Sequence, residues 1–371
     1  MTALLKQNYQ LSYKYVYNHD IMTCTAEGVI GNQLYSSRAL GLTEPWDMIQ
    51  LHESLESLWN DISAHYKRIG LSFTENIIWS VSLNHLGSHI GYHPSVFFFG
   101  PQEYKYWGDN EWLEIVNFIN SKNNFISIAK DLEIDIPQTL CFDSVLDITE
   151  DFIGNVVFPC YLKAAISVSG VGIYRCEDID DFKQALQKFN SKTPVQIQEE
   201  IVTETFLNLQ YQISNDQVIR LAASEQILDG FVHQGNRVPA KYEPWDAVDS
   251  MAYWLKDRGM KGIFAFDVAV VNSENGVRFP AIECNPRFNG ASYPTLIAQK
   301  LGISEWSAVN FTTKHRHLSE IDLTDIEYDS KTGEGAVIVN WGTVLEGKIV
   351  IMMAGSPDYQ EALNIELISR L

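Results

Sequence analysis

The order of hydrophobic and polar residues in the first third of the chain switches between two periods. Some stretches space their apolar side chains as on one face of a helix, and others form short apolar runs typical of buried strands. Together they predict an α/β unit over the first 115 residues. The predicted elements are a helix over 46–69, strands over 76–83 and 95–99, a polar turn over 104–109 and a short helix over 111–120.

The rest of the chain divides by the same pattern into two α+β units, residues 116–197 and 198–371. The pair Asn275–Gly276 between two hydrophobic runs is a strong signal for a hairpin turn. In the first unit we expect helices over 124–132 and 178–190, and strands after Pro137, up to Lys163, from Val171 and over 195–202. In the second we expect paired strands over 205–214 and 217–228, a helix over 247–260, a hairpin of 262–271 with 277–285, a helix from 293 past 301, and a hairpin over 335–353.

Composition and charge exclude several classes of partner. The chain has 371 residues, 46% of them hydrophobic, and a formal net charge of −20. This charge repels the phosphates of nucleic acids and anionic membranes, so we expect neither as a partner. The five cysteines are scattered and form no CxxC pair, which is typical of free thiols in a reducing compartment. With no signal peptide and no apolar run long enough to span a bilayer, we expect a soluble cytoplasmic protein.

Three polar residues on the predicted hairpin near residue 275 have the chemistry of a metal site. Glu283 and Asn285 are two apart on one strand and therefore share a face, and the antiparallel partner strand can place Asp267 beside them. Carboxylate and amide oxygens suit Mg²⁺ or Mn²⁺ better than zinc. Solvated acids at a sheet edge explain the same pattern equally well, so the residues alone leave both interpretations open.

A second candidate is a lysine followed by a loop of small residues. Lys163 ends a predicted strand and precedes Ser167, Ser169, Gly170 and Gly172. Glycines allow close approach of the backbone to a ligand, and successive N–H groups can bind phosphate oxygens. The spacing is neither that of a P-loop nor that of a dinucleotide fingerprint. Read alone, the segment is more often a plain β-turn.

The third candidate is the strand and acidic segment over residues 195–205. Its backbone can offer one N–H and one C=O to an adenine, and Glu204 can accept hydrogen bonds from ribose hydroxyls. An ordinary strand with an acidic end explains it better in isolation.

The order of these features along the chain resembles the ATP-grasp superfamily over residues 115–310. Lys122 comes first, then Lys163 with its glycine loop, Glu-Glu-Ile-Val at 199–202, Asp267, and ECNPR at 283–287. The resemblance implies an ATP-grasp fold of two α+β subdomains, a central lid (116–197) and a C-terminal catalytic part with an appended hairpin (198–371). Residues 1–115 then correspond to an N-terminal pre-ATP-grasp α/β domain, similar at 46–70 to that of peptide-ligase-like members.

The resemblance also implies a role for each matching residue. Two groups bind the nucleotide: Lys122, Lys163, Ser169, Gly170 and Gly172 at the phosphates, and Glu200, Val202 and Glu204 at the adenine and ribose. Asp267, Glu283 and Asn285 are the implied ligands of Mg²⁺ or Mn²⁺. Arg287 and Lys163 are the implied catalytic residues. Arg287 steadies the phosphorylated intermediate or the acceptor carboxylate, and Lys163 bridges the phosphates.

The implied reaction is the ADP-forming ligation of a carboxylic acid to an amine through an acylphosphate, with ATP as cofactor. Expected substrates are small carboxylates and amines, amino acids among them, and a homodimer is compatible with this interpretation. Two alternatives stay open: a kinase-like phosphotransferase of the same superfamily, and a non-catalytic nucleotide-binding module. Ala265 stands where some peptide ligases have an arginine, which argues against acceptor-carboxylate binding at that position.

Two further groups of polar residues need an interpretation. His85, His89 and His93 have helical spacing, but Gly87, Gly91 and Pro94 oppose a helix, so loop or strand histidines are favoured over a metal site. The polar segment 230–242 lies between two elements of the catalytic half, where it can line an acceptor pocket or form a surface loop. Its candidate substrate residues are His233, Asn236 and Arg237.

Overall fold

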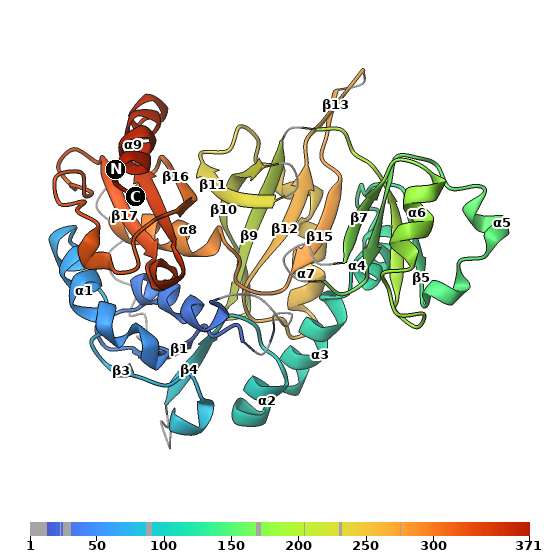
Figure 1. The fold of residues 1–371 in the computed structure, drawn as a ribbon. Helices are drawn as coiled ribbons and strands as arrows, with labels where there is room; N and C mark the ends of the chain where they lie inside the picture. Colours follow the sequence, from blue (N-terminus) through green and yellow to red (C-terminus); the bar gives the residue numbers. More distant parts are fainter. Residues whose placement is uncertain are drawn as a thin grey trace, which may run out of the picture.

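The computed structural model describes residues 13–22, 24, 31–86, 91–167, 172–203, 205–229, 232–274 and 276–371. The chain is mixed α/β, as predicted, and its strands form three main sheets with helices against them (Figure 1). Among the described residues, no helix combines the length and hydropathy needed to cross a bilayer. His85 and His93 lie in a short 3-10 turn and in a strand, and His89 lies outside the described residues.

The N-terminal sheet is parallel, with strand order β3-β2-β1-β4. Strands β2 and β3 lie on one side of β1 and β4 on the other, so the strand order reverses between β1 and β4. Open parallel sheets bind ligands at such a point, beyond the carboxyl ends of the strands. The strands are β1 (Lys14–Asn18), β2 (Met48–Gln50), β3 (Ile77–Ile78) and β4 (Tyr92–Val96), with helices η1 (Asn32–Leu42), η2 (Glu53–Leu58), α1 (Trp59–Arg68) and η3 (Leu83–Leu86).

Two predictions for this region were wrong in part. The helix expected over 46–69 begins only at α1, because Ile49 and Leu51, both fully buried, have the two-residue spacing of β2 and its continuation. The turn expected over 104–109 lies largely within the helix α2 (Pro101–Trp107). Pro101 suits the first turn of that helix, and Glu103 accepts a hydrogen bond from the Gly100 N–H at 3.0 Å, which caps it.

The second sheet is antiparallel, with order β5-β8-β6-β7 and a small core of its own. It lies at the opposite end of the molecule from the N-terminal sheet (Figure 1). Helix α4 joins it to the rest of the chain. The elements are α3 (Asn110–Ile119), α4 (Lys122–Asp131), β5 (Thr139–Phe142), η4 (Val145–Asp147), α5 (Glu150–Ile153), β6 (Cys160–Ala164), β7 (Ile173–Cys176), α6 (Ile179–Leu186) and β8 (Val195–Glu199).

The third sheet has eight strands in the order β15-β12-β9-β10-β11-β16-β18-β17. Both predicted hairpins lie in it, and a short β13–β14 ribbon extends the first. Its strands are β9 (Phe206–Ser214), β10 (Gln217–Asp229), β11 (Val232–Val238), β12 (Gly262–Ala269), β15 (Ala281–Asn285), β16 (Trp306–Thr312), β17 (Gly335–Asn340) and β18 (Lys348–Ala354). The ribbon strands are β13 (Val271–Ser273) and β14 (Gly276–Arg278), and the helices are η5 (Trp245–Ala247), α7 (Asp249–Lys256), α8 (Ser292–Leu301), η6 (Leu318–Glu320), η7 (Gly342–Glu346) and α9 (Pro357–Arg370).

Two expectations for this half differ from the structure, and one helix was missed. The stretch after residue 301 was expected to stay helical but forms β16, because Gly302 ends α8 in a left-handed conformation. The segment 230–242 contains β11 in place of a loop, since pairing with β10 and β16 satisfies its backbone. Helix α9 was not predicted at all. The proposed boundaries at 115/116 and 197/198 fall inside α3 and β8 and stay predictions.

One hydrophobic core joins the two ends of the chain. Ile49 and Leu55 of the N-terminal unit pack in the same buried cluster as Val337 and Ile351 of the C-terminal strands, and Figure 1 shows α1 and β17 on the same side of the molecule. A polar network fixes this contact. Glu327 accepts hydrogen bonds from Arg68 at 2.6 and 2.7 Å and lies 2.7 Å from His65 Nδ1, while His65 Nε2 accepts from the Ile338 N–H at 3.0 Å.

We expect Glu327→Gln to lower the free energy of unfolding by about 2 kcal/mol at pH 7, because it removes one charge from a buried, charge-assisted network. Burial alone would raise the pKa of Glu327, but Arg68 and His65 lower it from 4.5 to about 2. Its contribution is therefore present above pH 4.5 and is lost as the pH falls towards 2. Denaturant titrations between pH 4.5 and pH 2 should show that the free energy of unfolding falls more steeply for the wild type than for the variant.

The matched control for this experiment is Glu75→Gln. Glu75 pairs with Lys67 at 2.8 Å, but both side chains are more than 60% exposed. Exposed pairs contribute about 0–1 kcal/mol, so this change should leave stability almost unaltered. Equal effects of the two substitutions would contradict the role assigned to the buried network.

Candidate active site

Two acidic side chains lie side by side at the edge of the eight-stranded sheet. Asp267 on β12 and Glu283 on β15 are cross-strand partners, and a β-bulge follows between Asp267 and Val268. Asn285 donates to Asp267 Oδ2 at 2.9 Å and lies 3.5 Å from Glu283 Oε1. Cys284 alternates to the other face and packs in the core with α7. The three residues predicted as metal ligands therefore do converge.

The two carboxyl groups differ in their charged surroundings. Burial and the charge of Glu283 raise the pKa of Asp267 above its ordinary value. Burial opposes ionisation of Glu283 as well, but its pKa is lowered because Lys122 Nζ lies 2.8 Å from its Oε2, with Lys163 and Arg287 adding positive charge. Three cations thus favour the ionised form of Glu283, whereas Asp267 holds its proton more tightly than an ordinary aspartate.

Lys163 reaches this cluster from the antiparallel sheet. Its Nζ donates to Gln198 Oε1 at 2.6 Å and lies 5.3 Å from the centroid of the Tyr161 ring. Burial and Lys122 lower the pKa of Lys163 to about 8, although Glu283 opposes the shift. Gln198 in turn donates to Thr139 Oγ1 at 3.0 Å, which fixes the amide that holds Lys163.

The sequence analysis missed the amides that hold Asp267. Asn208 of β9 and Gln226 of β10 each donate to Asp267 Oδ1 at 2.8 Å, and Asn289 donates to Asn208 Oδ1 at 3.3 Å. For Asn208 the signal was present in the strict alternation of apolar and polar residues over 207–213, which places the amides on the face opposite the core. A row of amides therefore extends from the two acids across the sheet.

The predicted substrate residues of β11 separate into two groups. His233 Nε2 lies 2.7 Å from Asn236 Oδ1, and Asn236 is the cross-strand partner of Gln226, so both belong to the polar face that carries the amides. Burial lowers the pKa of His233. Arg237 alternates to the other face, where it pairs with Glu225 at 2.6 Å. The structure does not bring Arg237 together with the other two.

The predicted nucleotide-binding segments lie on either side of β6. Glu200 accepts hydrogen bonds from Arg175 at 2.5 and 3.0 Å, so its side chain is engaged, whereas Val202 is 87% exposed. Gly172 has φ +78°, a conformation that favours glycine. Ser169, Gly170 and Glu204 lie outside the described residues.

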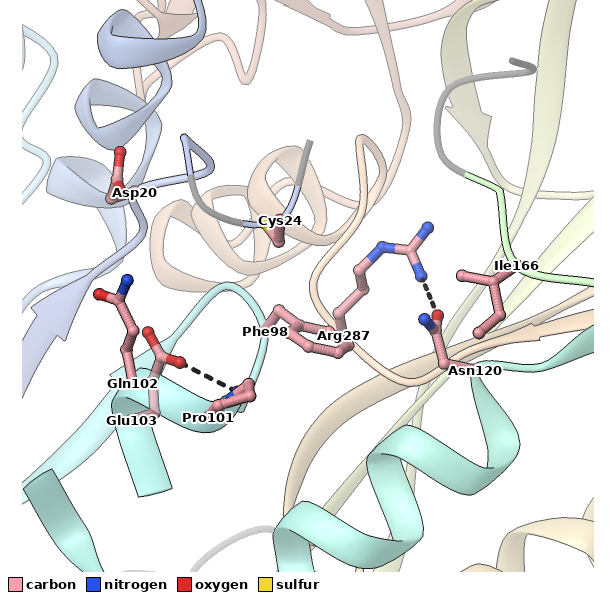
Figure 2. Close-up of a pocket in the computed structure, with 10 residues that line it drawn as sticks. Asp20, Cys24, Phe98, Pro101, Gln102, Glu103, Asn120, Ile166 and Arg287 are labelled. Carbon is pink, nitrogen blue, oxygen red and sulfur yellow. Dashed lines mark hydrogen bonds between the residues drawn. The ribbon is translucent and has the colours of Figure 1, made fainter. Parts of the chain in front are cut away.

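A cavity of about 390 Å³ opens beside this cluster (Figure 2). Arg287 extends into it between Cys24 and Ile166, and its Nη1 donates to Asn120 Oδ1 at 3.2 Å. Among the described residues no carboxylate lies within ion-pairing distance of Arg287. The other lining residues come mostly from the N-terminal unit and were not predicted: Asp20, Phe98, Gly100, Pro101, Gln102 and Glu103.

No protein-family model and no curated protein sequence matches this chain. Solved structures do match its fold. An N5-carboxyaminoimidazole synthetase from Staphylococcus aureus complexed with ADP has a TM-score of 0.61 at 12% identity, over 96% of this chain and 97% of that one. A biotin carboxylase from Campylobacter jejuni has a TM-score of 0.59 at 13% identity, over 88% and 85%. An L-amino acid ligase from Bacillus licheniformis has a TM-score of 0.53 at 12% identity, over 87% and 91%.

The chain has the ATP-grasp fold. This confirms the fold class predicted from the order of the motifs. At 12–13% identity, structural similarity establishes the fold but not the reaction. The roles of the site residues therefore have to be argued from the geometry of this chain.

The donors at the edge of this ATP-grasp sheet fit a divalent cation. Asp267 and Glu283 present hard oxygen atoms, while Asn285 points its amide N–H groups at them. The crowding that raises the pKa of Asp267 is relieved when a cation binds between the acids. Within the described ranges, no three His, Cys, Asp or Glu side chains gather as a metal site. Two carboxylates and one amide are typical of Mg²⁺ sites that substrate phosphates complete.

Contact between His233 and the turn after Arg287 can be tested. A Cβ at Gly290 would lie 2.9 Å from His233 Cε1, which is closer than packed atoms allow. We expect Gly290→Ala to displace the ring and lower the unfolding free energy by about 1–2 kcal/mol. The double variant with His233→Ala should recover most of that loss in thermal melts. Additive losses would show that the two residues do not touch.

Proposed function

We propose that this protein is an ATP-dependent ligase that joins a carboxylic acid to an amine through an acylphosphate and releases ADP and phosphate. The observation that carries the proposal is the convergence of Lys122, Lys163 and Arg287 on the Asp267–Glu283 pair beside a cavity. Similar structures support it by their own functions, since they include an L-amino acid ligase and a synthetase complexed with ADP.

The nucleotide would bind between the antiparallel sheet and the edge of the eight-stranded sheet. Lys122 and Lys163, with the segment of Ser169, Gly170 and Gly172, would hold the phosphates. Backbone groups of Glu200 and Val202 would take the adenine and Glu204 the ribose. Asp267, Glu283 and Asn285 would hold Mg²⁺, which supplies charge neutralisation on the phosphates when bound.

The chain's own residues give the proposed reaction a physical logic. A carboxylate is a poor electrophile, and conversion to an acylphosphate provides a leaving group that an amine can displace. The ammonium of Lys163, held by Gln198, would stabilise the negative charge of the transferring phosphoryl group. Arg287 is held by a neutral amide and has no described acidic partner, so its charge is free to orient the acid or its phosphorylated form.

Product analysis tests the proposed reaction. ATP incubated with pooled small acids and pooled amines should yield ADP and phosphate only when both pools are present, with an amide detectable by mass spectrometry. Release of AMP and pyrophosphate would contradict the acylphosphate route. A stable phosphorylated product formed without any amine would instead identify a phosphotransferase.

We expect Glu283→Ala to reduce ADP release by roughly 100- to 1000-fold, because it removes a proposed ligand of the Mg²⁺ that would neutralise charge on the phosphates. The variant should keep its circular-dichroism spectrum, since Glu283 lies on the polar face of β15 and its removal leaves the core intact. Glu274→Ala, at the exposed tip of the β13–β14 ribbon, is the control and should keep wild-type turnover. Undiminished ADP release by Glu283→Ala would rule out the proposed metal site.

A further inference from the structure

Arg38 is a buried cation with two guanidinium nitrogens that have no hydrogen-bond partner. It lies in η1, is 8% exposed, and both its Nε and its Nη2 are buried without a hydrogen bond. No carboxylate of the described residues lies within ion-pairing distance. Its guanidinium lies instead against three aromatic rings, 4.4 Å from the centroid of Tyr293, 4.6 Å from Phe97 and 5.2 Å from Tyr35.

The unpaired edge of Arg38 is the one that other arginines of this chain use to bind carboxylates. Arg68 donates from Nε and Nη2 to the two oxygens of Glu327, at 2.7 and 2.6 Å. Arg278 binds both oxygens of Asp135 through the same two nitrogens, at 3.1 and 2.6 Å. This paired geometry is the strongest that a guanidinium makes with an anion. Arg38 has the same edge and no anion on it.

The neighbours of Arg38 cannot supply that anion. His19 lies 2.9 Å from the Tyr293 hydroxyl and 3.1 Å from Ser95 Oγ, and burial and Arg38 lower its pKa, so the ring is neutral. Burial raises the pKa of Tyr293, so its hydroxyl stays protonated. Aromatic rings offset part of the cost of burying a charge, but they do not satisfy its N–H groups.

The location of Arg38 links it to the cavity that contains Arg287. His19 follows β1 and Phe97 follows β4, so both mark the point where the strand order of the parallel sheet reverses. Phe98 lines the cavity, and the Phe97 carbonyl accepts from the N–H of Phe288, the residue after Arg287, at 3.1 Å. Cys24 also lines the cavity, and the charges of both Arg287 and Arg38 act on its thiol.

We propose that Arg38 binds a carboxylate of the substrate other than the one that is phosphorylated. This inference rests on the proposed function and narrows it, because the acid or the amine must then bear a second, unreacted carboxylate. Dicarboxylic acids and α-amino acids both satisfy this requirement. Because Nε and Nη2 are covered in the free chain, a neighbouring side chain must move aside when the carboxylate binds.

Ligand-dependent thermal shifts test this site without turnover. The probes are free L-amino acids and linear dicarboxylates, each compared with its amide or monoamide, in the presence of ADP and Mg²⁺. At least one free carboxylate should stabilise the wild type while its amide does not. Arg38→Met should lower the affinity for that probe by about 10- to 100-fold, the loss expected when charge-assisted hydrogen bonds are removed.

The variant and its control separate binding from folding. Arg38→Met keeps a similar length and apolar contacts with the rings, and it removes an uncompensated buried charge, so its melting temperature without probe should be unchanged or higher. Arg278→Met removes an arginine whose side chain is 55% exposed and which pairs with Asp135, and it should leave the probe affinity unaltered. A strong loss of stability in Arg38→Met would assign the guanidinium to the core and overturn the proposal.

The remaining outcomes distinguish the site from the reaction. Stabilisation only by amino acids would place the carboxylate on the amine substrate, and stabilisation only by dicarboxylates would place it on the acid. Failure of every probe on the wild type, or equal affinity in Arg38→Met, would overturn the site. Probe binding that depends on Arg38 without any ADP release would retain the site and reject the ligase. Efficient ligation of substrates that have no second carboxylate would support the ligase and reject the Arg38 site.

Discussion

The repulsion between two partly buried carboxyl groups organises the centre of this molecule. Asp267 and Glu283 are fixed opposite each other by the pairing of β12 with β15, so they cannot separate without breaking the sheet. Each of the other polar groups nearby reduces the cost of that arrangement. Lys122 pairs with Glu283 from the first turn of α4, Lys163 adds charge from β6, and amides of the central strands donate to Asp267. The convergence of the two acids and the proposed cation site are therefore consequences of strand register.

The two faces of the eight-stranded sheet differ in character, since one packs in the hydrophobic core and the other carries the polar cluster. On one face Phe264 and Phe266 pack with Met251 and Leu255 of α7 in a dry core. On the other face a row of amides continues from the acids towards β11. Because side chains alternate along a strand, each strand contributes to both faces at once. Asn208 between Leu207 and Leu209 illustrates this, since the two leucines are fully buried in the core while the amide holds Asp267.

The sequence predicted which residues converge at this site better than it predicted the elements around them. Asp267, Glu283, Asn285 and the two lysines were found because their order along the chain is specific and their spacing follows strand geometry. The prediction of a helix over 46–69 was wrong in part because a short apolar run fits the spacing of a helix and of a strand equally well. The prediction of a turn over 104–109 was wrong because the capped helix α2 forms there in spite of its polar residues. Asn208, Gln226 and Arg38 were missed for a different reason. Their partners lie far away in the sequence, and no local pattern distinguishes an amide that holds a carboxylate from one that faces water.

The cavity depends on contacts between distant parts of the chain. Its Arg287 lies directly after β15, whereas Asp20 and Phe98 follow strands of the parallel sheet, and the backbone bond from Phe288 to Phe97 joins the two sides. The core shared by the chain ends holds the parallel sheet against the eight-stranded sheet, so this wall of the cavity is set by folding. The antiparallel sheet, in contrast, has a core of its own and contributes Lys163 through a single strand. The residues proposed for the phosphates and those that line the cavity thus belong largely to separately packed parts of the chain.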